Sequence, residues 1–211
     1  SATAGLAAAH QAHADGLLPF DLGRLVPAWL RALAVGATSA LLGSYTGVLI
    51  SATAIPVWFS GRRVLPALFV CSATSNACAL HLGRLALAPG RHGETYRRRV
   101  RRVAVALCGE ALLLRRYERS AGRLGDPLFR GEIGNQLRGG AALIGIALPT
   151  ILNLTSGFAK QAHDGPAHRA RALLAAGLTL YGGFVLRRSI LRAGKKSADD
   201  PQAYVNHRRP S

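Results

Sequence analysis

Residues 32–60 have the sequence ALAVGATSALLGSYTGVLISATAIPVWFS, which contains no Lys, Arg, Asp or Glu. An α-helix of about 20 apolar residues crosses the hydrocarbon core of a bilayer, so this run is long enough to span a membrane. Residues 64–83, 139–159 and 172–186 are also free of these charged side chains. The pattern predicts an all-α fold, a polytopic bundle of transmembrane helices.

Positive charge is concentrated between the uncharged runs. The 211 residues include 27 Lys and Arg against 10 Asp and Glu, which gives a formal net charge of +17. A soluble nucleic-acid-binding domain gathers such charge on one face. Arginines that instead flank apolar segments are typical of multi-pass membrane proteins. We therefore expect membrane lipid around the bundle and exclude a nucleic acid as partner.

About five spans are expected, at residues 32–55, 64–85, 103–114, 139–159 and 171–186. Residues 1–31 form a polar lead-in, 32–187 the bundle, and 188–211 a soluble, turn-rich tail. The link between the first two spans is so short that they should form an antiparallel hairpin. The third span is short and bounded by arginines, and an interfacial amphipathic helix is its alternative interpretation.

Small side chains recur along the first expected span. Ser39, Gly43, Gly47 and Ser51 are spaced four residues apart, so they share one face of a helix. Such a stripe lets a neighbouring helix approach closely within a bilayer. We expect these four residues to serve helix packing.

Tyr45 and Thr46 lie on other faces of the same span. A tyrosine hydroxyl inside a bilayer needs a hydrogen-bond partner, because an unpaired polar group is costly there. Either a neighbouring helix or a bound polar head, such as a quinone carbonyl, could supply that partner. Both interpretations stay open, and Tyr45 and Thr46 are candidate quinone contacts.

Two ionisable residues fall within expected spans. His81 is a packing histidine in one interpretation, and a proton carrier or quinone contact in the other. Glu110 is the one acidic residue inside a span, and intramembrane carboxyls are costly and often functional. It is a candidate proton relay, unless it forms an ion pair with Arg84, Arg115 or Arg116.

The sequence offers few residues that could ligate a redox metal. Cys71, Cys78 and Cys108 all lie in apolar segments, and three thiols cannot hold a four-thiolate cluster. A membrane haem normally takes two axial side chains, whereas His81 is the one histidine within a span. We therefore expect no metal site, haem or iron–sulfur cluster in this chain, and no catalytic residue of its own.

Several stretches resemble the NrfD-type family, the membrane subunits of polysulfide-reductase-like complexes. They are GSYTGVL at 43–49, AIPVW at 54–58, LPALFVCSA at 65–73, and RSILRAG at 188–194 with SADDP at 197–201. Family members have more spans than are expected here, so the resemblance implies a member truncated at its N-terminus.

The resemblance also implies a function. The chain would be a quinone-interacting anchor in the bacterial cytoplasmic (inner) membrane. It would take menaquinone or ubiquinone as substrate and pass electrons between quinol and a ferredoxin-like iron–sulfur subunit. That subunit would serve a molybdopterin catalytic subunit in anaerobic respiration. The alternatives are a purely structural anchor and a small transporter, whose midplane site would use Pro149 and Glu110.

Overall fold

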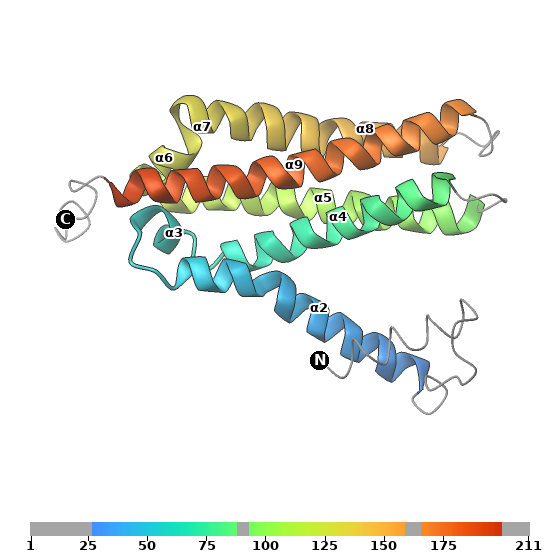
Figure 1. The fold of residues 1–211 in the computed structure, drawn as a ribbon, viewed down its shortest axis with the longest axis horizontal. Coiled ribbons are helices and arrows are strands. Elements are labelled where there is room, and N and C mark those ends of the chain that lie inside the picture. The colour runs from blue at the N-terminus through green and yellow to red at the C-terminus, as the bar shows by residue number, and fades with distance from the viewer. Residues whose placement is uncertain (1–26, 88–92, 159–165, 200–211) are drawn as a thin grey trace.

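The computed structural model describes residues 27–87, 93–158 and 166–199. All regular structure in these ranges is helical, and the long helices lie side by side along one axis (Figure 1). They are α2 (Ala28–Ser51), α4 (Leu65–Leu87), α5 (Gly93–Ala121), a column formed by α7 (Gly131–Gln136), η3 (Leu137–Ala147) and α8 (Leu148–Phe158), and α9 (Pro166–Ala198). The expected all-α class is thus confirmed.

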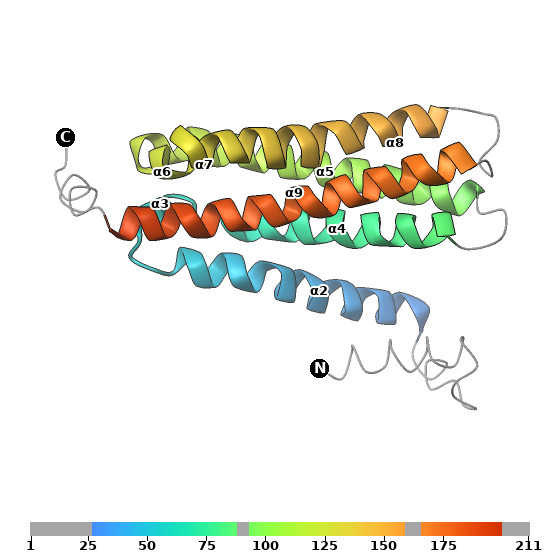
Figure 2. The same cartoon turned by 45° about the horizontal axis from the view of Figure 1, so that its top comes forward.

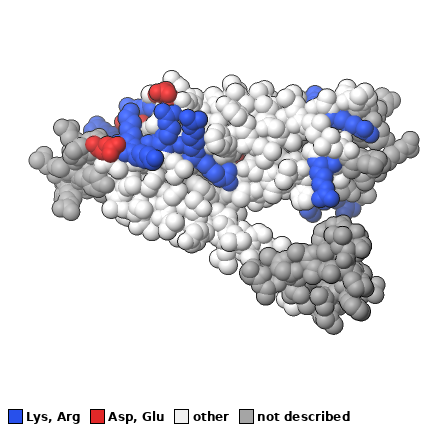
Figure 3. All heavy atoms as spheres, in the orientation of Figure 1, with Lys and Arg blue, Asp and Glu red and all other residues white. Residues whose placement is uncertain are grey.

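Three segments of the described chain are long enough to cross a membrane. Ala32–Ser51, Leu65–Leu87 and Gly131–Thr155 are long and apolar enough to cross a bilayer. Figure 3 shows two groups of basic side chains, toward opposite ends of the bundle, with an uncharged region between them. This arrangement is compatible with a membrane protein. The expected count of about five spans is not confirmed, because α5 and α9 do not meet the same criteria.

Four of the columns enclose the interior, and α2 lies outside them. Helix α9 packs against α4, η3 and α8, while α4 also packs against α5. Helix α2 packs on α4 and on the short α3 (Pro56–Ser60), and its N-terminal half diverges from the bundle in both views (Figures 1 and 2). One face of α2 is therefore left open.

The turn at one end of the bundle depends on glycine. Short helices η2 (Gly122–Gly125) and α6 (Asp126–Phe129) connect α5 to α7, and Gly131 follows with φ of 65°. Residues that carry a side chain rarely adopt this left-handed backbone conformation, so glycine is favoured where the chain reverses. Tyr117 and Phe129 fill the space beneath, with their ring centroids 5.3 Å apart in an edge-to-face arrangement.

The column after this turn contains an unusual helix. Residues Leu137–Ala147 form a π-helix, whose wider turns are often found at functional sites. Pro149 is fully buried directly beyond it and lacks a backbone N–H. A proline removes one helical hydrogen bond, and the eleven residues of the π-helix end two positions before it.

Helix lengths differ from the expected boundaries in three places. The third span, expected at 103–114, is the middle of α5, which continues through Ala121. The polar connector expected after it contains η2, α6 and α7. Residues 188–198, expected in a turn-rich tail, continue α9 as helix, so that expectation is wrong for them. The rest of the tail and nearly all of the lead-in lie outside the described residues.

Candidate functional site

The small-residue stripe of α2 faces α4 over part of its length. A Cβ atom on Gly47 would lie 2.8 Å from the Leu65 carbonyl oxygen, so the two backbones are in direct contact there. Gly43 lies opposite Val70 and Ala73. Ser51 is buried, whereas Ser39 is exposed and belongs to the N-terminal half of α2, the half that diverges from α4 (Figure 1). Close packing therefore holds the C-terminal half of α2 in place.

Tyr45 points away from that contact. Its side chain is 63% exposed, and its hydroxyl has no hydrogen-bond partner within the described residues. Thr46 is also exposed. The surrounding face is apolar, with large exposed side chains Leu41, Leu42, Val48 and Leu49. A polar hydroxyl on an apolar face in a membrane is a position where a bound polar group would be stabilised.

His81 does not join Tyr45. It is exposed on α4, eight residues beyond Ala73, which is the level of Gly43 on the opposing helix. At the helical rise this corresponds to about 12 Å along the axis. The three candidate quinone contacts therefore do not form one site, and Tyr45 with Thr46 stands apart from His81.

Glu110 lies inside the bundle, where it is 3% exposed. Its partner is a hydroxyl of α4: Ser75 Oγ lies 3.0 Å from Glu110 Oε2. No ion pair of Glu110 with Arg84, Arg115 or Arg116 is present, so the structure does not favour the ion-pair alternative. Arg187 of α9 is within electrostatic range of the carboxyl, but its guanidinium donates to the Gly183 carbonyl at 3.1 Å.

The hydrogen bonds around Ser75 constrain this carboxyl. Ser75 Oγ also lies 3.0 Å from the Ser72 carbonyl oxygen, and a hydroxyl has one hydrogen to donate. The single hydroxyl hydrogen of Ser75 can be donated to the Ser72 carbonyl oxygen. The contact between Ser75 and Glu110 is then also a hydrogen bond if Glu110 is protonated and donates to Ser75 Oγ. The site is therefore able to hold a proton.

Unsatisfied polar atoms lie near this carboxyl. Ser72 Oγ is buried beside Glu110 without a hydrogen bond of normal geometry, and Asn76 Oδ1 also has no partner in the described chain. The Asn76 side chain lies against Gly183 of α9, where no larger residue would fit.

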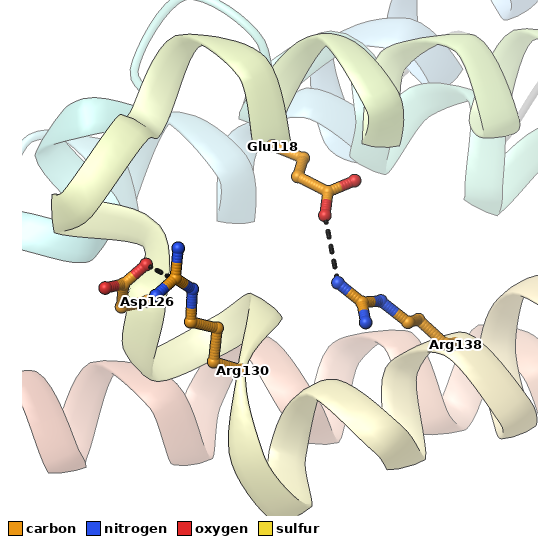
Figure 4. A network of polar contacts seen from close by, with 4 residues as sticks. All are labelled: Glu118, Asp126, Arg130 and Arg138. Atoms are coloured by element: carbon orange, nitrogen blue, oxygen red, sulfur yellow. Dashed lines mark hydrogen bonds and ion pairs between the residues drawn. The ribbon is translucent and has the colours of Figure 1, made fainter.

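Charged side chains at the α6–α7 end are partly paired. Figure 4 shows Glu118 of α5 and Arg138 of η3 pointing toward each other, 3.2 Å apart, and Asp126 beside Arg130 at 3.1 Å. These groups are substantially exposed, so each pair contributes at most about 1 kcal/mol. They were not anticipated as a site, and their spacing in the sequence gives no signal of the contact between α5 and η3.

Metal ligands do not gather anywhere in residues 27–87, 93–158 or 166–199: no three His, Cys, Asp or Glu side chains come together. Cys71 and Cys78 are half-buried and Cys108 is exposed, all as free thiols.

Comparison with known proteins assigns no family. No family model matches the chain, and no curated protein or solved structure is significantly similar to it.

Proposed function

We propose that this chain is the quinone-interacting membrane anchor of a respiratory iron–sulfur and molybdopterin oxidoreductase. The observation that carries the proposal is the phenol of Tyr45, which lies on the apolar, open face of a membrane-length helix with no partner in the described residues. A quinone carbonyl would satisfy that hydroxyl without leaving the lipid. The NrfD-like motif at 43–49 includes this tyrosine, which supports the same ligand.

The proposal gives α2 one wall of the quinone site. Thr46 adjoins Tyr45, and the exposed leucines of α2 would contact the apolar tail. Helix packing at Gly43 and Gly47 keeps the wall in position against α4. The other wall belongs to the rest of the complex, and α5 and α9 would complete about five spans in this chain.

Quinol oxidation releases two protons and two electrons for each quinol. The iron–sulfur subunit would take the electrons, because the described residues gather no metal ligands. Glu110 is able to hold a proton within the bundle, as its contact with Ser75 indicates. It lies in α5, which packs on α4 and away from α2, so we assign it to proton transfer and not to quinone contact.

The test is quinol-dependent turnover of the purified complex carrying Tyr45→Phe, which removes the hydroxyl and keeps the ring. Loss of one hydrogen bond of about 1–1.5 kcal/mol should lower kcat/KM for menaquinol by about fivefold to tenfold. Tyr181→Phe is the matched control, since Tyr181 is exposed on α9. Unchanged turnover in Tyr45→Phe removes Tyr45 from the site.

The function as a whole has a separate test. The chain, purified in mild detergent from its source membrane, should carry an iron–sulfur protein and reduce or oxidise added quinone. A chain that purifies without an iron–sulfur protein, or a complex indifferent to quinone, would contradict the proposal.

A further inference from the structure

A groove runs along the outer surface of the bundle between η3 and α9. Its volume is about 440 Å³, within the range of small-molecule clefts. One wall is the π-helix, with Gly139, Gly140 and Ile144, and the other is the exposed face of α9. The lining is mostly uncharged and has Arg188 at one end, so lipid would contact the groove if the bundle is embedded in a membrane.

The α9 wall changes from aromatic to basic side chains along its length. Tyr181, Phe184 and Arg188 are spaced three and four residues apart, so they follow one another on a single face. Beyond them α9 lines a second cleft of about 280 Å³, formed by Phe184, Leu191 and the four basic residues Arg187, Arg188, Arg192 and Lys195. Aromatic surface therefore leads directly to positive charge, in the order in which a phospholipid presents its tail and phosphate.

Two polar groups at the cationic end have no partner. Arg188 forms no ion pair or hydrogen bond within the described residues. Ser189 lines the groove, is 1% exposed, and its hydroxyl has no hydrogen-bond partner there either. A buried hydroxyl without a partner is uncommon and indicates a missing ligand or water. Arg192 differs, because it donates to Gln136 at 3.1 Å and lies 3.9 Å from Glu132.

The cleft on the other side of η3 offers a contrast. It has a volume of about 230 Å³, and Arg138 and Glu118 at its edge form the ion pair seen in Figure 4. This cleft is lined by Arg115 and Arg138, and its carboxylate, Glu118, partly neutralises them, whereas no acidic side chain lines the groove of Arg188. Charge complementarity favours the η3–α9 groove for an anionic ligand.

We propose that the groove between η3 and α9 binds an anionic phospholipid, with its phosphate at Arg188 and Ser189 and an acyl chain along Tyr181, Phe184 and Gly139. Arginine is well suited to phosphate because its donors match two oxygens at once. The proposal depends on the membrane location of the bundle and is independent of quinone chemistry, so either proposal can fail alone.

The experiment measures lipid retention by native mass spectrometry of the complex in detergent. The probes are dioleoyl phosphatidylglycerol and dioleoyl phosphatidylcholine, which share their tails and differ in net charge. We expect the wild type to bind phosphatidylglycerol more tightly. One arginine near a membrane surface is worth about 1 kcal/mol, so Arg188→Gln should weaken phosphatidylglycerol binding by about fivefold. Arg116→Gln removes the same charge from an exposed position on α5 and should have no effect.

A second variant tests the groove and not the charge. A Cβ on Gly139 would meet open space, so the side chain in Gly139→Leu would enter the groove without a backbone clash. We expect it to reduce retention of phosphatidylglycerol. Gly177→Leu is the control, because Gly177 is equally open but lies outside the groove.

Equal binding of the two lipids would overturn the proposal, as would equal effects of Arg188→Gln and Arg116→Gln. A photo-reactive amino acid in place of Phe184 identifies the occupant directly. Cross-links to phospholipid support the proposal, and cross-links to a protein subunit overturn it.

Discussion

The carbonyl oxygen of Val57 accepts two side-chain hydrogen bonds at the α3 end of the bundle. Tyr117 OH donates to it at 2.6 Å and Ser60 Oγ donates to it at 2.7 Å. Tyr117 is fully buried, and its ring packs against Phe129 and against the backbone of Gly61. The ring is so close to Gly61 that a side chain at position 61 would not fit. Tyr117→Phe therefore removes one hydrogen bond and leaves the packing intact.

The two hydroxyls should be coupled energetically. A buried hydrogen bond contributes about 1 kcal/mol, whereas a buried group left without its donors costs about 1–3 kcal/mol. Tyr117→Phe and Ser60→Ala should each cost about 1 kcal/mol, because the other hydroxyl still serves Val57. The double variant should cost about 3 kcal/mol, which exceeds the sum and gives a coupling energy of about 1 kcal/mol.

Unfolding by sodium dodecyl sulfate in mixed micelles measures these energies. Trp58 is a native fluorescence reporter of this end, since its indole N–H donates to the Ile190 carbonyl at 2.9 Å. Tyr181→Phe is the control, because that tyrosine is 51% exposed and should tolerate the change. Strict additivity of Tyr117→Phe and Ser60→Ala, or an effect of Tyr117→Phe no larger than that of the control, would refute the reasoning.

Three further outcomes are expected. Ser75→Ala should destabilise the fold by about 1–3 kcal/mol, because it removes the hydroxyl partner of buried Glu110, whereas Ser75→Thr should restore much of the loss. Gly182→Leu should cost about 3 kcal/mol or more, since its Cβ would occupy the backbone of η3, while Gly177→Leu has open space and should be close to neutral in the same unfolding assay. Arg138→Gln should change stability by less than about 1 kcal/mol, and a larger loss would show that its exposed ion pair is more than a surface contact.

Helical class and the close approach of the first two long helices followed from local sequence. Uncharged runs indicated the helices, and glycines at 43 and 47 indicated where α2 meets α4. Both signals depend on residues near each other in the chain. The exposure of the face around Tyr45 could not be predicted in this way. Periodicity distinguishes the faces of a helix, but it does not say which neighbouring helix covers each face.

Other features depended on contacts between distant residues. An arginine was one possible partner of Glu110, yet the observed partner is the hydroxyl of Ser75, which is 35 positions away on a neighbouring helix. The π-helix was also not predicted, and Pro149 was named only as part of a possible transporter site. The fifth span was expected to end at residue 186, but α9 continues as a helix because Ile190 and Ala193 are buried against the bundle.

The membrane location is tested most directly at Cys108, an exposed native thiol in the middle of α5. A spin label on this residue, with Cys71 and Cys78 replaced by alanine, reports its surroundings by collision with oxygen or with a water-soluble nickel chelate. In liposomes containing the intact complex, we predict frequent collisions with oxygen and few with the chelate. Free access of the chelate to the label would contradict a bilayer around this bundle.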